Sequence, residues 1–406
     1  MCRAEKWKGL FPGRRRHRRR FGPEARIRRN GQQSACNDDG AGNGEPDETR
    51  MIPQCIGSEA GNLELREMTR RLMHGENLTR AEAAEFLEAL LNPSATDTQV
   101  AAALAVLTAK GETVEELTGM AEAMRNRAIP VRSSHARFID TAGTGSSLAK
   151  VFNVSTAAAF VIAGAGVPVA KHGSRAATSF CGSADVLEAL GVNTAASPET
   201  VQRCLNEHGI CFMFAPIFHR ATARVAHVRR ELGVRTTFNL LGPLTNPARA
   251  PFQILGVWHP SLLERVAAAL SLLGVEKAWV VHGADGLDEI SITDKTIVAA
   301  CLPNGSLETF TISPQDFGLK PQSLDGFGGT DARTNAELIR TILDGEKTKD
   351  TAAARDLVIV NAAAALHVAG VADDLCKAAK LAHESIDSGR AASKLDALIR
   401  ETNQDR

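Results

Sequence analysis

From about residue 137 onward, short runs of strand-like composition alternate with segments of helical periodicity. This alternation is typical of a parallel sheet covered by helices, because each parallel connection crosses over through a helix. Strands are predicted at 137–139, 167–170, 211–215, 253–257, 278–281, 296–300 and 309–312, and helices at 159–165, 184–190, 262–273, 334–343 and 352–369. The fold class is therefore α/β, with a mixed, largely parallel sheet.

The stretch before it has a purely helical pattern. Apolar residues recur there at three-to-four spacing, and two of its helices are predicted at 96–110 and 113–127. Thr79 lies three residues before Glu82, which is the spacing of a capping box that opens an earlier helix. This pattern predicts a separate helical unit ahead of the sheet.

A chain of 406 residues can bury two or three cores, and 44% hydrophobic with 23% charged residues is ordinary for a globular enzyme. We expect a small N-terminal helical domain at 61–135, completed by a basic helical segment at about 219–245. An α/β domain is expected at 136–400. Residues 1–60 are predicted to be a disordered basic and polar extension, because they hold little that could be buried.

The charge of the chain is divided unevenly. The formal net charge is +0, but residues 1–30 contain ten Arg, two Lys and two Glu, so the remainder is acidic. An acidic body disfavours binding of nucleic acid, because it has no basic surplus to neutralise phosphates. The Arg-rich tail leaves RNA contact and a targeting role as alternatives. Acidic residues between Asp38 and Glu48 count against a transit peptide.

Membrane insertion and disulfide bonding are not expected. The longest apolar run, Ala157–Ala170, has 14 residues, whereas a membrane-spanning helix needs about 20. The N-terminus lacks the apolar region of a secretory signal. The eight Cys show no paired spacing and are interpreted as buried thiols in a reducing compartment, not as a zinc site or a disulfide framework. A cytoplasmic protein is therefore predicted.

Two Gly-rich and hydroxyl-rich segments follow the first predicted strands. The first is a turn from Asp140 to Ser147, followed by Asn153–Thr156 at the start of an Ala-rich helix. Backbone amides in such a turn and at a helix N-terminus favour phosphate. A tight turn with an ordinary helix cap would give the same pattern.

The second segment starts with Lys171, His172 and Gly173 at the end of a strand and continues with Arg175, Ser179 and Ser183. Two cations beside hydroxyls and a flexible glycine suit a polyanion such as pyrophosphate. Because both segments follow neighbouring strands, we expect them at the edge of the sheet where α/β proteins bind ligands.

Two further groups carry charge. Asp288 and Glu289 are adjacent carboxylates in a Gly-rich turn after a strand, which can hold Mg²⁺ with one or two ligands and waters. Most such pairs are merely solvated. Arg229 lies in a rigid cationic segment and could bind a carboxylate substrate, or it could be one of several solvated charges on a helix.

Seven strings together resemble the anthranilate phosphoribosyltransferase family over about residues 65–400. They are Gly143–Gly145, Phe152–Thr156, Lys171–Gly173, Gly182–Gly191, Val228–Gly233, Phe238–Pro247 and Gly286–Glu289. The resemblance implies a pentosyl-transferring glycosyltransferase of tryptophan biosynthesis. It would transfer the 5-phosphoribosyl group from phosphoribosyl pyrophosphate to the amine of anthranilate, and release pyrophosphate. A homodimer joined through the helical parts is also implied.

The same resemblance implies roles for individual residues. The phosphoribosyl pyrophosphate site would comprise Gly143, Thr144, Gly145, Ser146, Ser147, Asn153, Val154, Ser155, Thr156, Lys171, His172, Gly173, Arg175, Ser179 and Ser183. The anthranilate site would comprise Gly143, His172 and Arg229. Two Mg²⁺ ions would be held by Ser155, Asp288 and Glu289. No general base is assigned, because an aniline nitrogen is already nucleophilic and positioning matters more.

The sequence departs from the family pattern at several positions. Ser146 and Ser147 replace Gly and Asp, and Val151 replaces Thr. Arg220 replaces a Pro, and Ser174 replaces an Asn that touches the acceptor, so that another aromatic amine stays possible as substrate. With Lys150 adding positive charge, we expect a donor site that is electrostatically retuned.

The sequence leaves three alternatives to this activity. One is transfer to another aromatic amine, and a second is a nucleoside phosphorylase of the same fold, which Arg229 and the Asp288–Glu289 pair disfavour. The third is a non-catalytic nucleic-acid binder acting through the Arg-rich tail, whose affinity would fall steeply with salt.

Overall fold

The computed structural model describes residues 62–145, 151–176, 181–327 and 331–404. Every described residue belongs to one compact unit, Ser58–Arg406. The predicted extension at 1–60, Ser146, Ser147, Lys150 and Ser179 lie outside the described residues.

The first four helices are α1 (Leu63–Met73), α2 (Arg80–Leu91), α3 (Asp97–Lys110) and α4 (Val114–Arg127). The predicted capping box is confirmed, because the Thr79 side chain accepts from Glu82 N–H and the Glu82 carboxylate accepts from Thr79 N–H. Thr96 and Thr113 open α3 and α4 in the same way. Between the helices the core is apolar, with Phe86, Leu90 and Leu104 fully buried.

A seven-stranded sheet follows in the order β3-β2-β1-β4-β5-β6-β7. Its strands are β1 (Ile139–Gly143), β2 (Val169–Gly173), β3 (Ile210–Phe214), β4 (Phe252–Gly256), β5 (Lys277–Gly283), β6 (Thr296–Cys301) and β7 (Leu307–Ile312). Neighbours from β3 to β5 are parallel, and β6 and β7 join antiparallel. The predicted mixed, largely parallel sheet is confirmed.

The first strand differs from its prediction. The sequence predicts a strand at 137–139 and a turn at Asp140–Gly143, whereas β1 runs from Ile139 to Gly143. Residues 139–143 pair in register with residues 252–256 of β4, which makes this a central strand. A charged residue and a glycine are unusual in such a strand, so composition ended it too early.

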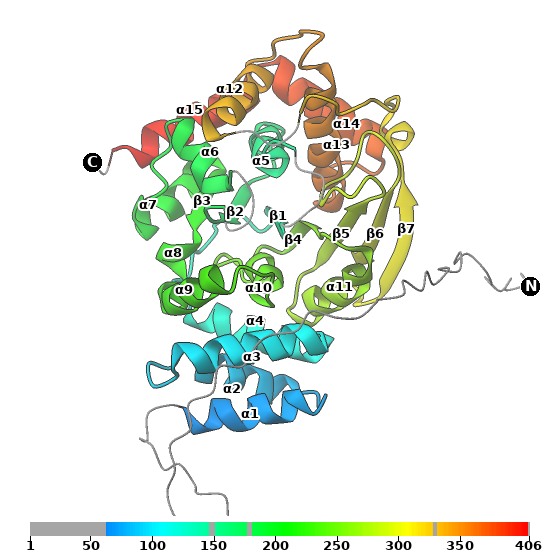
Figure 1. Ribbon diagram of the computed structural model, residues 1–406. Helices are drawn as coiled ribbons and strands as arrows, with labels where there is room; N and C mark the ends of the chain where they lie inside the picture. The colour runs from blue at the N-terminus through cyan, green and yellow to red at the C-terminus, as the bar shows by residue number, and fades with distance from the viewer. Residues whose placement is uncertain (1–61, 146–150, 177–180, 328–330, 405–406) are drawn as a thin grey trace, which may run out of the picture. The chain divides into compact units, whose positions relative to one another are not determined.

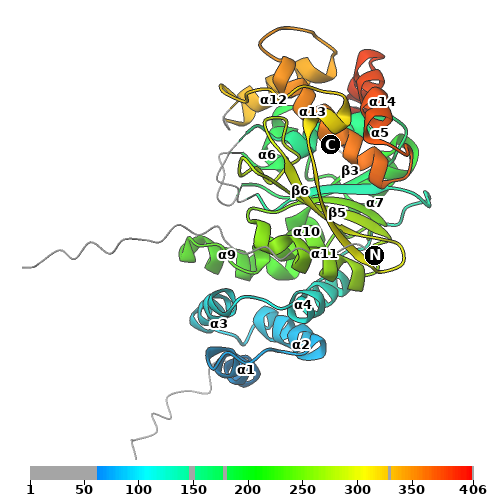
Figure 2. The ribbon, with the colours of Figure 1, turned by 90° about the vertical axis from the view of Figure 1, so that its right-hand side faces the viewer.

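Helices cover both faces of the sheet (Figures 1 and 2). On one face lie α5 (Val154–Gly164) and α13 (Ala352–Val368), and on the other α10 (Phe238–Leu244) and α11 (Leu263–Leu272). The remaining helices are α6 (Ser183–Ala189), α7 (Pro198–Arg203), α8 (Ala215–Phe218), α9 (Ala223–Leu232), α12 (Ala332–Leu343), α14 (Leu375–Asp387) and α15 (Arg390–Thr402). Local sequence patterns did not predict α7, α14 or α15.

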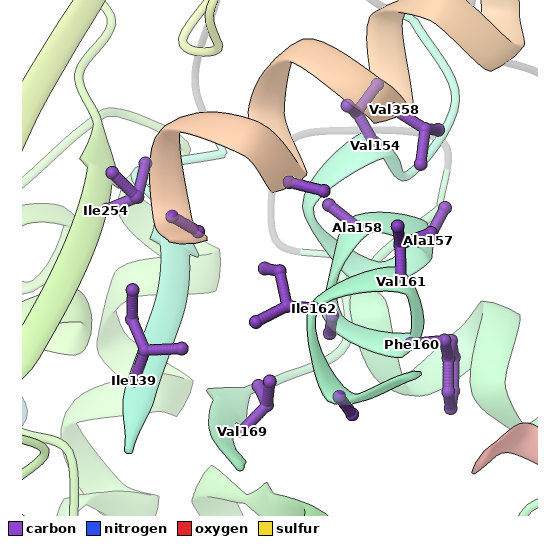
Figure 3. Packing of buried hydrophobic residues seen from close by; sticks show 14 of the residues in the cluster. Ile139, Val154, Ala157, Ala158, Phe160, Val161, Ile162, Val169, Ile254 and Val358 are labelled. Carbon is purple, nitrogen blue, oxygen red and sulfur yellow. The ribbon is translucent and has the colours of Figure 1, made fainter. Parts of the chain in front are cut away.

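Two apolar cores flank the sheet. Figure 3 shows Ile139, Val169 and Ile254 of three strands facing Ile162 of α5. On the opposite face, side chains of α11 and β5 join the core of the first four helices. Arg125 of α4 also donates to the carbonyl oxygens of Leu244 (2.7 Å) and Leu273 (3.1 Å).

The basic segment between β3 and β4 connects with the first four helices. Arg224 of α9 donates to the Asp97 carboxylate and to the Pro93 carbonyl oxygen, and α10 packs on α4. Within the described residues, none of the helices is long and apolar enough to cross a membrane.

Candidate active site

One cavity of about 420 Å³ opens where the carboxyl ends of β1 and β2 meet the N-termini of α5 and α6. It brings together most of the residues singled out from the sequence. They are Gly143, Thr144, Gly145, Asn153, Ser155, Lys171, His172, Gly173, Arg175, Ser183, Arg229, Asp288 and Glu289. Carboxyl ends of parallel strands are the expected place for a ligand, because loops there can vary without disturbing the sheet.

Two predicted residues do not reach the cavity. Val154 and Thr156 lie in the first turn of α5 and are 1% exposed. Val154 packs in the apolar core beside Val358 of α13 (Figure 3). Their side chains therefore support the helix whose N-terminus faces the cavity.

The acidic end of the cavity is built by backbone amides. Gly145 N–H donates to Asp288 Oδ2 at 3.0 Å, and Ser155 N–H donates to Glu289 Oε1 at 3.3 Å. Because Ser155 lies in the first turn of α5, the helix dipole favours the Glu289 charge. Burial and the neighbouring Asp288 nevertheless raise the pKa of Glu289 above its usual range.

This end has the donor set that a hard divalent cation requires. Two carboxylates and the Ser155 hydroxyl line one cavity, and the described part of the chain gathers no group of three or more His, Cys, Asp or Glu that could hold a metal. Mg²⁺ is usually bound by one or two carboxylates with waters and substrate phosphates. A cation would also relieve the repulsion between the adjacent carboxylates, so the residues fit Mg²⁺ bound together with a phosphorylated substrate.

Lys171 forms part of the buried wall. Its ammonium donates to the Thr141 carbonyl oxygen (2.6 Å) and to Ser155 Oγ (3.3 Å). Burial lowers the pKa of Lys171, while Asp140 and Glu289 oppose that shift. Burial disfavours the charged form of Asp140 as well, and it raises the pKa of this carboxyl to about 6, although Lys171 favours the charged form. The Lys171 ammonium is thus fixed beside the carboxylates rather than free in solvent.

His172 is held as a neutral hydrogen-bond acceptor. Its Nδ1 lies 3.1 Å from the Gly242 carbonyl oxygen, so Nδ1 must carry the proton. Nε2 is buried and has no partner among the described residues. The ring of His219 lies edge-on at 5.0 Å. Burial is the main cause that lowers the pKa of His172 to about 3 and of His219 to about 4.

Arg229 is oriented by its neighbours in α10. Its Nη2 donates to Asn239 Oδ1 at 3.1 Å, and its guanidinium lies 5.5 Å from the ring centroid of Phe238. Nε is buried with no partner among the described residues, and burial lowers the pKa of this arginine. A planar guanidinium with an unused donor suits an anionic group of a ligand.

Arg175 has different surroundings. Its guanidinium forms ion pairs with Asp185 (2.9 Å) and Glu188 (2.6 Å) and lies over the Phe214 ring. It lines the cavity, but carboxylates on α6 already compensate its charge.

The structure adds residues that the sequence did not single out. Asn335 of α12 lines the cavity and donates to Asn153 Oδ1 at 3.1 Å. His219 also lines the cavity, as do Phe238 and Asn239, which belong to the string Phe238–Pro247 but had been assigned no role. Asn335 lies far along the chain in an amphipathic helix, and no local pattern distinguishes it from a solvated residue.

Comparison with known proteins agrees with this architecture. The model of the "Glycosyl transferase family, a/b domain" matches residues 135–392, and that of the "Glycosyl transferase family, helical bundle domain" matches residues 66–128. An anthranilate phosphoribosyltransferase of Moorella thermoacetica is 50% identical over 335 residues, covering 82% of this chain and 97% of the relative. One of Rubrobacter xylanophilus is 48% identical, covering 83% and 97%.

Solved structures give the same result. The anthranilate phosphoribosyltransferase of Thermus thermophilus has a TM-score of 0.76 at 40% identity, covering 82% of this chain and 99% of that one. The enzyme of Saccharomyces cerevisiae, in complex with PRPP and Mg, has a TM-score of 0.77 at 28% identity, covering 86% and 99%. The family models, the relatives and the fold agree with the seven sequence strings. The chain therefore belongs to the anthranilate phosphoribosyltransferase family.

Proposed function

We propose that this chain transfers the 5-phosphoribosyl group of phosphoribosyl pyrophosphate to the amine of anthranilate, giving N-(5-phosphoribosyl)anthranilate and pyrophosphate in tryptophan biosynthesis. The observation that carries the proposal is that one cavity has two parts. Its acidic end contains the carboxylates of Asp288 and Glu289 and the hydroxyl of Ser155, and the oriented Arg229 guanidinium also lines it. A polyphosphate with Mg²⁺ and an aromatic carboxylate require these two chemistries in one site.

The donor would bind along the edge formed by β1, α5 and β2. Gly143 lies against Asp288, with only 3.3 Å between the Asp288 carboxylate and the place of a Cβ at this glycine. A larger residue would therefore crowd the phosphate side of the cavity. The described residues that would surround the phosphoribosyl donor there are Thr144, Gly145, Asn153, Ser155, Lys171, Gly173 and Ser183.

Cleavage of the bond between C1 of ribose and pyrophosphate builds positive charge on the sugar and negative charge on the leaving group. Lys171 and the amides at the start of α5 stabilise that negative charge from fixed positions. Mg²⁺, which we propose as two ions held through Ser155, Asp288 and Glu289, would supply further neutralisation of the phosphates.

The acceptor would be positioned by its carboxylate on Arg229, with His172 and Gly143 beside its ring. Because His172 stays neutral, it adds no charge that would oppose the positive charge of the sugar. The aniline nitrogen then attacks C1 as the bond from C1 to pyrophosphate breaks, and its proton passes to solvent. Orientation of the two substrates lowers the barrier to this step.

The test is a reaction of purified protein with phosphoribosyl pyrophosphate, Mg²⁺ and anthranilate. Loss of anthranilate fluorescence and release of pyrophosphate should proceed together and stop when Mg²⁺ is chelated. Pyrophosphate release only with another aromatic amine would keep the transferase and reject the acceptor; Ser174, which lines the cavity, is the residue to examine then. No release with any acceptor would reject the proposal.

We also infer a homodimer and a cytoplasmic location. The apolar side chains of Leu63 and Met73 on α1 are 75% and 69% exposed, which supports contact with a second copy through the helical part. The thiols of Cys211, Cys301 and Cys376, which form no disulfide among the described residues, support a reducing compartment. Sedimentation analysis and cell fractionation test these two inferences.

A further inference from the structure

Asn361 is a buried amide in the middle of an apolar helix. It lies in α13, where it is 3% exposed and is surrounded in sequence by Val360, Ala362 and Ala363, which are completely buried. An amide without partners in such a place would destabilise the protein. We therefore expect Asn361 to form hydrogen bonds with a buried polar group, which an apolar side chain at this position could not do.

That partner is the backbone of Ile290, which is itself 1% exposed. Asn361 Oδ1 accepts from Ile290 N–H at 2.9 Å, and Nδ2 donates to the Ile290 carbonyl oxygen at 3.0 Å. A third bond runs from Nδ2 to the Leu357 carbonyl oxygen at 2.9 Å within α13. The side chain thus pairs with both polar groups of one residue, as a neighbouring strand would.

The residue held in this way directly follows Glu289. The Glu289 carboxylate accepts from Ser155 N–H of α5, and α13 packs on the same end of α5 through Val358 and Val154 (Figure 3). One helix therefore holds two parts of the acidic end: it supports α5 by apolar packing, and it fixes the segment after β5 through Asn361.

The other side of this segment is fixed separately. Asp285 Oδ2 accepts from the hydroxyls of Ser291 (2.5 Å) and Thr293 (2.6 Å), and its Oδ1 accepts from Leu287 N–H. Asp285 therefore maintains the turn from within, whereas Asn361 ties it to the rest of the domain. Loss of Asn361 would leave a well-formed turn in the wrong position.

We propose that Asn361 is the positioning residue for Glu289 and sets the affinity of the acidic end for the divalent cation. The inference rests on the proposed function, since the cation enters with the phosphorylated donor. Asn361 touches neither cation nor substrate, and it acts by fixing the backbone at residue 290. Replacement by Leu, which has a similar size, would leave both polar groups of Ile290 buried without partners.

The test compares Asn361→Leu with Leu366→Ala, a truncation at a completely buried position of the same helix. Leu366 lies five residues further on, about 7.5 Å along the axis, and supports packing only. Binding of Mn²⁺ in the presence of phosphoribosyl pyrophosphate is measured by electron paramagnetic resonance, beside the Michaelis constant for anthranilate. We expect Asn361→Leu to weaken Mn²⁺ binding at least tenfold, with the anthranilate constant changed less than twofold, and Leu366→Ala to change neither.

Equal Mn²⁺ affinity in Asn361→Leu and the unmodified protein would overturn the inference, and so would an equal loss in Leu366→Ala. If the unmodified protein itself binds no Mn²⁺ with the donor, the proposed function fails instead. Should Asn361→Leu not fold, Asn361→Asp keeps the shape and the acceptor oxygen for the same comparison. Hydrogen exchange of the unmodified protein adds a direct check, because an Ile290 amide that exchanges as fast as an exposed loop amide would contradict the pairing.

Discussion

At the scale of single residues, the cavity is marked by polar atoms that are buried but not fully used. His172 Nε2 and Arg229 Nε have no partner among the described residues, and Glu289 is buried beside a second carboxylate. Burial of such groups without partners costs free energy, so these atoms are unfavourable for stability alone. The residues that carry these groups all line one cavity, as expected if a ligand supplies matching groups.

Arg229 can be tested against a neighbour in the same helix. Arg229→Gln removes the charge that would face the substrate carboxylate, and a hydrogen bond to a charged group contributes about 1.5–3 kcal/mol. We therefore expect the Michaelis constant for anthranilate to rise roughly tenfold to a hundredfold, with the donor constant unchanged. Arg230→Gln, at an exposed position of α9, is the matched control and should leave both constants as they are.

The two buried histidines predict a dependence of stability on pH. Their pKa values in the folded protein, about 3 for His172 and about 4 for His219, lie below the ordinary value of 6.5. Below pH 6.5 the unfolded chain binds protons that the folded protein does not, so the free energy of unfolding falls with pH until the folded values are reached. Between pH 6 and 5 each histidine should contribute a loss of roughly 1.2 kcal/mol, and the loss from His219 should level off as the pH approaches its folded value of about 4.

The measurement is urea unfolding at pH 7, 6 and 5 of the unmodified protein and of His172→Gln and His219→Gln. Each replacement should reduce the slope with pH. Asp140 opposes the histidines, because its pKa is raised to about 6 and its protonation favours the folded state. For that reason the difference in slope between proteins is decisive, and unchanged slopes would contradict neutral histidines in the fold.

At the scale of elements, the cavity depends on how closely backbones approach. β1 and β4 lie side by side, and the segment after β5 crosses them at Gly256. A Cβ on Gly256 would lie 1.6 Å from the Asp288 carbonyl oxygen and 2.5 Å from its carbonyl carbon. Only a glycine at position 256 lets the segment of Asp288 and Glu289 reach the strand ends. The reason is the close approach of two backbones, and not an unusual backbone conformation of the glycine.

Gly256→Ala should therefore displace Asp288 and Glu289 together. We expect at least a hundredfold loss of kcat/KM and weaker activation by Mg²⁺, because even about 1 Å of displacement at a reacting centre costs roughly two orders of magnitude in rate. The unfolding transition of the variant shows whether the fold is retained. Full activity would mean that the acidic end is less constrained than the contact at Gly256 indicates.

At the scale of the whole molecule, the described unit accounts for the family match. Residues 66–128 and 135–392 match the two family models, and all the described site residues lie between Ser58 and Arg406. The helical part is joined to the sheet through α10, α11 and the bonds of Arg125. The cavity itself draws on α4, through Met124, as well as on the strands.

Removal of residues 1–57 tests the Arg-rich extension. We expect kcat/KM to change less than twofold. The free energy of unfolding should change by less than about 0.5 kcal/mol, because surface changes away from a core are usually of that size. If the extension binds RNA, the full-length protein should show salt-sensitive binding that the shortened protein lacks. A large loss of transferase activity on shortening would show that the extension takes part in the site.

Regular patterns along the chain were enough to predict many of the elements and the family. Helical spacing placed α3, α4 and α11, alternation of strands and helices predicted the mixed sheet, and seven ordered strings predicted a phosphoribosyl-transfer site. Local rules suffice there, because periodicity and capping are properties of neighbouring residues. The assignment of each site residue to donor, acceptor or cation stays a prediction.

Which groups meet in the cavity depends instead on packing between distant segments. β1 was ended too early because its polar residues are buried by pairing with β4, which lies more than 100 residues further on. The tautomer of His172 is set by the Gly242 carbonyl oxygen, and the backbone directly after Glu289 is held by Asn361. These partners are distant in sequence and carry no periodic signal, since a single hydrogen bond across the fold depends on packing and not on local propensity.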